Sequence, residues 1–114
     1  MGRWPDRFRG RGLPAGQGGE FEMRVRKHVY YSGSVQGVGF RYTARRLARD
    51  AGLTGFVKNL GDGRVEIVVE GRAGAVDRYL ADVAEAMAGY ISRAEALDEP
   101  PADEFDAFTV AVDR

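Results

Sequence analysis

Residues 53–71 read L-T-G-F-V-K-N-L-G-D-G-R-V-E-I-V-V-E-G and predict two strands joined by a tight turn. The second half alternates apolar with charged side chains, Val65, Ile67 and Val69 against Arg64, Glu66 and Glu70, which is the period of a half-buried strand. Asp62-Gly63 separates the two halves, and this dipeptide favours the turn of a hairpin. We therefore expect antiparallel strands over residues 53–60 and 64–70.

An amphipathic helical pattern lies on each side of this hairpin. Before it, apolar residues recur at helical spacing at Phe40, Ala44, Leu47, Ala48 and Ala51, and Gly52 is a good helix stop. After it, the same spacing appears at Val76, Tyr79, Leu80, Val83 and Met87. Residues 25–35 and 90–97 have the composition of strands. The predicted order is therefore β-α-β-β-α-β.

A further short strand is expected after Pro100-Pro101, where Phe108, Val110 and Val112 alternate. It is either an extra strand or a continuation of a split fourth strand. Two right-handed crossovers and one hairpin predict an α+β fold, a ferredoxin-like βαββαβ sandwich with an antiparallel sheet and two helices on one face. This fold hosts many functions, so function must be argued from a site.

Composition narrows the class of protein. The 114 residues carry 17 basic and 17 acidic side chains, and this zero net charge argues against a general nucleic-acid binder. The absence of cysteine excludes disulfides, thiolate metal sites and cysteine nucleophiles. No apolar run approaches the roughly 20 residues that span a bilayer. We expect a cytoplasmic, monomeric protein without membrane or nucleic-acid partners.

Residues 1–22 differ from the rest of the chain, being rich in Gly, Arg and Pro without apolar periodicity. This composition predicts a disordered N-terminal extension preceding a domain over residues 23–114. A weak polyanion-binding arm is the alternative interpretation, since the basic residues concentrate in the first 11 positions.

The stretch G-S-V-Q-G-V-G-F-R at residues 33–41 carries the first chemical signal. Its paired glycines allow successive N–H groups to turn toward one point, and the start of a helix adds unpaired donors. Arg41 adds a full charge with a planar donor fork. A Walker loop and a dinucleotide fingerprint both fail, because the Lys-Ser/Thr pair and the third glycine are missing. The remaining interpretations are a cradle for a single phosphoryl group and a plain turn beside a solvated arginine.

Asn59 is the second chemical signal, a polar residue near the end of an otherwise apolar strand. An amide offers a donor and an acceptor, so it can orient a water molecule without taking its proton. The alternative is that Asn59 only shapes the following turn.

Two segments together resemble the acylphosphatase family: V-Q-G-V-G-F-R at 35–41 and G-F-V-K-N-L at 55–60 are similar to its two signature motifs. Phe56 stands where many members carry tryptophan. The resemblance implies hydrolysis of an acyl phosphate to a carboxylate and phosphate, with neither metal nor cofactor. It assigns Arg41 and Asn59 as catalytic, with Asn59 holding the attacking water. It places the phosphoryl group on Arg41 and the main-chain N–H groups of Gln36, Gly37, Val38, Gly39, Phe40 and Arg41.

Other functions remain as alternatives. An RNA-binding module shares the βαββαβ order, but Gly55-Phe56-Val57 lacks the basic residue and further aromatics of its signature. A second alternative is a non-catalytic anion-binding or interaction module. A third is the acylphosphatase-like segment of larger carbamoyl-transferring maturation proteins. We interpret His28 as a structural or surface residue, because nothing in the sequence pairs it with a base or other charged partner. Arg45, Arg46 and Arg49 are expected to form the solvated face of the first helix.

Overall fold

The computed structural model describes residues 23–112, and the predicted extension at residues 1–22 lies outside them. Along the chain the elements are β1 (Arg24–Gly33), α3 (Phe40–Asp50), β2 (Thr54–Asn59), β3 (Val65–Arg72), α4 (Ala73–Ala86), β4 (Ile91–Glu99) and β5 (Phe108–Val110). Every helix and strand predicted from the sequence is present, with ends that differ by a few residues.

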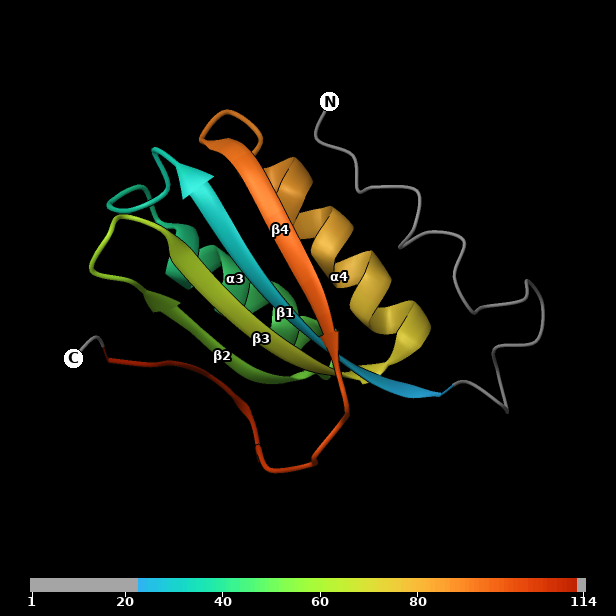
Figure 1. The fold of residues 1–114 in the computed structure, drawn as a ribbon. Coiled ribbons are helices and arrows are strands. Elements are labelled where there is room, and N and C mark those ends of the chain that lie inside the picture. The colour runs from blue at the N-terminus through green and yellow to red at the C-terminus, as the bar shows by residue number, and fades with distance from the viewer. Residues whose placement is uncertain (1–22, 113–114) are drawn as a thin grey trace.

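The strands form one sheet in the order β4-β1-β3-β2-β5, and both helices cover the same face of it (Figure 1). Strand β1 pairs antiparallel with β3 and β4, and β2 pairs antiparallel with β3. These four strands confirm the ferredoxin-like sandwich. Strand β5 is an extra strand that pairs parallel with β2 at the opposite edge from β4, so the complete sheet is mixed.

The hydrophobic core lies between the sheet and the two helices. Strands contribute Val29, Tyr31, Val57, Val65, Ile67 and Val69, and helices contribute Phe40, Ala44, Ala48, Val76, Tyr79, Leu80 and Val83. The Tyr31 and Phe40 rings pack with centroids 5.0 Å apart, so the first turn of α3 is anchored on β1. The Tyr79 hydroxyl donates to the Ala44 carbonyl at 2.9 Å and joins α4 to α3. These contacts fix the start of α3 beside the sheet.

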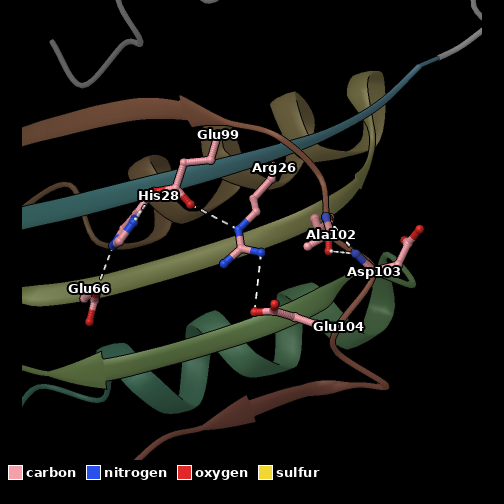
Figure 2. Close-up of polar contacts among 8 residues, drawn as sticks. Arg26, His28, Glu66, Glu99, Ala102, Asp103 and Glu104 are labelled. Carbon is pink, nitrogen blue, oxygen red and sulfur yellow. Dashed lines mark hydrogen bonds and ion pairs between the residues drawn. The ribbon is translucent and has the colours of Figure 1, made fainter.

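The connection between β4 and β5, residues 100–107, is held against the face of the sheet away from the helices (Figure 2). Glu70 of β3 is fully buried, and its carboxylate accepts the main-chain N–H groups of Ala102 and Asp103. Phe105 packs edge-on against Phe56 of β2, with ring centroids 5.9 Å apart. This attachment brings the chain from the β4 edge to the β2 edge.

His28 lies in a chain of charged contacts on that same face (Figure 2). Its Nε2 is 2.6 Å from Oε2 of Glu66 on β3, and its Nδ1 is 2.7 Å from Oε2 of Glu99 on β4. Glu99 forms an ion pair with Arg26 at 3.1 Å, and Arg26 lies 3.5 Å from Glu104. The expectation that His28 has no charged partner is therefore wrong. Its partners stand 38 and 71 residues away, and the central position of β1 brings them together.

Candidate active site

The loop between β1 and α3 contains two glycines in the left-handed conformation that its sequence predicts. The Ser34 N–H donates to the Tyr90 carbonyl at 2.9 Å and holds the start of the loop. Gly37 and Gly39 have φ of 79° and 84°, in the left-handed region. A Cβ on either glycine would meet nothing within 4 Å, so the need for glycine is conformational. When left-handed residues alternate with right-handed ones, successive main-chain N–H groups point to the same side and can bind an anion.

Helix α3 begins at this loop, and its first N–H groups have no main-chain partner within residues 23–112. The first intrahelical bond runs from the Thr43 N–H to the Gly39 carbonyl at 3.0 Å, so the N–H groups of Phe40, Arg41 and Tyr42 precede it. No side chain of the described residues caps this end, and its first turn contains no acidic residue. The partial positive charge of the helix N-terminus is thus uncompensated, which favours an anion.

A cleft of about 400 Å³ opens beside the helix start. It is lined by Val35, Gly37, Gly39, Phe40, Arg41, Tyr42, Arg45, Asn59 and Val110. The predicted residues Gly37, Gly39, Phe40, Arg41 and Asn59 therefore meet at one place. Gln36 and Val38 do not line the cleft, and Val38 packs half-buried against the core. The Arg41 side chain is exposed and forms no hydrogen bond or ion pair with residues 23–112, so it is available to a ligand.

Asn59 ends β2, where its main chain lies opposite Val65 of β3. Its side-chain Oδ1 is buried and has no hydrogen-bond partner within the described part of the chain. An unpaired buried carbonyl costs about 1–3 kcal/mol, so such groups in native proteins call for an explanation. The Asn59 residue also lines the cleft, so a molecule bound there lies next to its side-chain amide.

Gln36 contributes a side-chain contact that the sequence did not predict. Its Nε2 donates to the main-chain carbonyls of Leu60 at 2.8 Å and Arg64 at 2.9 Å. Leu60 follows Asn59 directly, and both carbonyls belong to the turn between β2 and β3. The side chain of Gln36 thus links the glycine loop to the strand end that carries Asn59.

Four cleft residues were absent from the predicted site: Val35, Tyr42, Arg45 and Val110. Arg45 is half-buried, so the expectation that it lies on the solvated face is wrong, whereas Arg46 and Arg49 are exposed. Helical spacing carried a signal for Arg45, because residues four apart share one side of a helix. Val110 had no such signal, since it reaches the cleft only through the parallel pairing of β5.

The charges around the cleft are all positive in the part of the chain that the structure describes. Arg41, Arg45 and the start of α3 supply them, and no acidic residue lines the cleft. Over residues 23–112, no three His, Asp or Glu side chains gather as a metal site would require. Neither helix there is long and apolar enough to cross a membrane.

The fold and the cleft together define a small α+β domain with a positively charged cleft at the start of a helix. The family model described as Acylphosphatase matches residues 27–110. The chain belongs to the acylphosphatase family. The motifs that suggested this from the sequence lie within the matched residues.

Individual relatives agree with the family assignment. The chain is 41% identical over 83 residues to an acylphosphatase from Archaeoglobus fulgidus, an alignment that covers 73% of this chain and 93% of the relative. Its structure resembles that of an acylphosphatase from Bacillus subtilis with a TM-score of 0.69 and 30% identity, over 76% of this chain and 98% of that one. T. kodakarensis HypF matches with a TM-score of 0.66 and 36% identity, over 78% of this chain but only 12% of HypF. These likenesses do not favour an RNA-binding module.

Proposed function

We propose that the cleft beside Arg41 is the catalytic site of an acylphosphatase, an enzyme that hydrolyses acyl phosphates to a carboxylate and inorganic phosphate. The observation that carries the proposal is the meeting of two groups in one cleft. Arg41 stands at a helix start that no described side chain caps, and Asn59 lines the same cleft with a side-chain amide. The first suits a phosphoryl group and the second suits a water molecule.

In this scheme the phosphoryl group is held by charge and by main-chain donors. Arg41 presents a planar fork that matches two phosphoryl oxygens. The N–H groups of the loop and of the first turn of α3 point at the remaining oxygen, since they have no acceptor within the helix. Negative charge on these oxygens is stabilised as the transition state forms, which is the main task of a protein in phosphoryl transfer.

Asn59 holds the attacking water. Its Oδ1 accepts one O–H of the water, which leaves a lone pair on the water oxygen to face phosphorus. A bond forms between that oxygen and phosphorus while the bond from phosphorus to the acyl oxygen breaks, and the electron pair leaves on the carboxylate. The water proton passes to the product phosphate or to solvent. The acid of the leaving group has a pKa near 4, so its departure requires no protein acid.

The same chemistry limits the range of substrates. An alkyl phosphate ester releases an alkoxide, a far poorer leaving group than a carboxylate, and among the described residues no His, Asp, Glu or Lys lines the cleft to protonate it. We therefore expect hydrolysis of acyl phosphates and no useful activity toward alkyl phosphate esters. The scheme requires no metal ion or cofactor.

Hydrolysis of benzoyl phosphate in the presence of excess EDTA tests the proposal. We expect turnover that persists in the chelator, with glycerol phosphate as a control ester that is not cleaved. Absence of turnover above the spontaneous rate would exclude the enzyme. Binding of inorganic phosphate without any turnover would instead identify a non-catalytic anion-binding module.

A further inference from the structure

Arg45 is a second arginine in the cleft, and the scheme above gives it no task. It follows Arg41 by four residues in α3, so the two side chains share one side of the helix about 6 Å apart along its axis. Both line the cleft. Among residues 23–112, neither forms a hydrogen bond or an ion pair with another side chain.

The surroundings of Arg45 distinguish it from its neighbour in sequence. Arg46 is 53% exposed and faces Asp50 at 4.0 Å, the ordinary arrangement of a solvated helix surface. Arg45 is half-buried, and no carboxylate of the described residues lines the cleft to neutralise it. Tyr42 and Val110 lie in the same lining and offer apolar surface. A ligand group beside Arg45 thus meets a positive charge next to apolar walls.

From this arrangement we infer that Arg45 binds a second anionic group, one carried by the acyl part of the substrate. The inference rests on the proposed function, because it takes the phosphoryl group to occupy Arg41. The preferred substrates are then acyl phosphates with a carboxylate or a phosphate a few carbons from the reacting carbonyl. Tyr42 and Val110 contact the carbons between the two anions.

The physical reason is a difference between two classes of acyl group. A neutral acyl group in the cleft leaves Arg45 with water alone. An anionic acyl group gains a charge-assisted hydrogen bond at a partly desolvated site, where such bonds are stronger than at an open surface. A general positive potential would also favour the additional charge of an anionic acyl group, but Arg46, which lies outside the cleft lining, would then contribute to the preference as Arg45 does.

A matched pair of substrates tests this directly: benzoyl phosphate and 4-carboxybenzoyl phosphate. They share the reacting centre and the aromatic ring and differ by one carboxylate. We expect kcat/KM of the native protein to be about tenfold higher for 4-carboxybenzoyl phosphate, the size of one charge-assisted hydrogen bond in a partly open cleft. The ratio should decrease as salt is added, because salt screens a partly exposed charge pair.

Three variants then assign the preference to a residue. Arg45→Gln should bring the ratio of the two kcat/KM values close to one, and Arg45→Lys should retain much of it because the charge stays. Arg46→Gln is the matched control and should leave both kcat/KM values unchanged. A ratio near one in the native protein, or a ratio that survives in Arg45→Gln, overturns the inference. Failure of the native protein to hydrolyse either substrate overturns the proposed function itself.

Discussion

The side-chain Nε2 of Gln36 donates to the main-chain carbonyl of Leu60 at 2.8 Å. The same nitrogen donates to the carbonyl of Arg64 at 2.9 Å, and the Leu60 N–H closes the turn by donating to that carbonyl at 2.8 Å. Gln36 belongs to the loop that leads into Arg41, and Leu60 follows Asn59. One amide group thus connects the element that would hold the phosphoryl group to the element that would hold the water.

Gln36→Ala should lower kcat for benzoyl phosphate about tenfold or more with a smaller change in KM. The reason is geometric, since a displacement near 1 Å between reacting groups can cost up to about a hundredfold in rate. Gln36→Glu should show the same loss, because a carboxylate cannot donate to the two carbonyls. Steady-state kinetics and phosphate titration by calorimetry provide the measurements. A kcat equal to that of the native protein in both variants would mean that the contact is only structural.

Arg41→Ala should abolish turnover and greatly weaken the binding of inorganic phosphate. The cradle loses the full charge next to its main-chain donors, and we expect a decrease in kcat/KM of about a thousandfold or more. Stability should change little, because the Arg41 side chain is exposed and has no partner in the described part of the chain. Calorimetric titration with phosphate and a thermal melt separate the two effects. Retained phosphate affinity would remove Arg41 from the site.

Asn59→Ala should lose turnover while keeping phosphate affinity within a small factor. The variant removes only the acceptor for the water, and the donors of the glycine loop and Arg41 remain. Asn59→Asp should lose both properties, because a carboxylate in the cleft repels the phosphoryl oxygens. Kinetics with benzoyl phosphate and phosphate titration on the same preparations distinguish the two patterns. Full activity in Asn59→Ala would refute the assignment of the water to this residue.

Features that depend on local patterns were predictable from the sequence. The helices and strands follow from periodicity, and Arg41 and Asn59 stand in short motifs whose chemistry can be read residue by residue. The structure brings both into one cleft, although their catalytic roles stay predictions. The acylphosphatase resemblance rested on the same motifs, and the family match over residues 27–110 confirms it.

Features that depend on pairing between distant segments were not predictable. The carboxylates beside His28 come from β3 and β4, which only the central place of β1 brings together. Val110 reaches the cleft because β5 crosses to the far edge of the sheet. The Gln36 side chain finds its acceptors in a turn 24 and 28 residues away. No local pattern predicts such partners, because each contact depends on how strands far apart in the sequence pair with one another.

Tyr31→Phe should stabilise the protein by about 1 kcal/mol, since it removes a buried hydroxyl that has no partner within residues 23–112. Tyr79→Phe is the matched control and should destabilise by about the same amount, because that hydroxyl donates to Ala44 at 2.9 Å. Urea unfolding at neutral pH measures both. If both substitutions changed the free energy of unfolding by the same amount, Tyr31 and Tyr79 would not differ in hydrogen bonding as described.

The pH dependence of Tyr31→Phe provides a second check. Full burial raises the pKa of Tyr31 far above its usual value of 10.0. The unfolded chain therefore ionises first, and the native protein loses stability as the pH rises above about 10. Tyr31→Phe should lose less over that range, so its advantage in the free energy of unfolding should increase with pH. An advantage that does not increase would contradict the burial of the Tyr31 hydroxyl.

Glu70→Gln should destabilise the fold by about 2 kcal/mol and loosen the attachment of residues 100–107. The carboxylate accepts two main-chain N–H groups at a fully buried position, and a glutamine amide would lose the negative charge that strengthens both bonds and would place an NH₂ donor where one acceptor oxygen lies. The loss of stability should extend to β5, because residues 100–107 lead directly into that strand. Hydrogen exchange at the Ala111 N–H, which bonds to the Val57 carbonyl at 2.8 Å, would report it.

Glu104→Gln is the control for Glu70→Gln, because Glu104 is 54% exposed and lies 3.5 Å from Arg26. An ion pair at 3.5 Å whose carboxylate is this exposed contributes about 0–1 kcal/mol, so its loss should leave exchange at Ala111 almost unchanged. Glu70→Gln should in addition raise KM for benzoyl phosphate, since Val110 of β5 lines the cleft. If hydrogen exchange at the Ala111 N–H were no faster in Glu70→Gln than in Glu104→Gln, the buried carboxylate would not be the group that holds β5 beside β2.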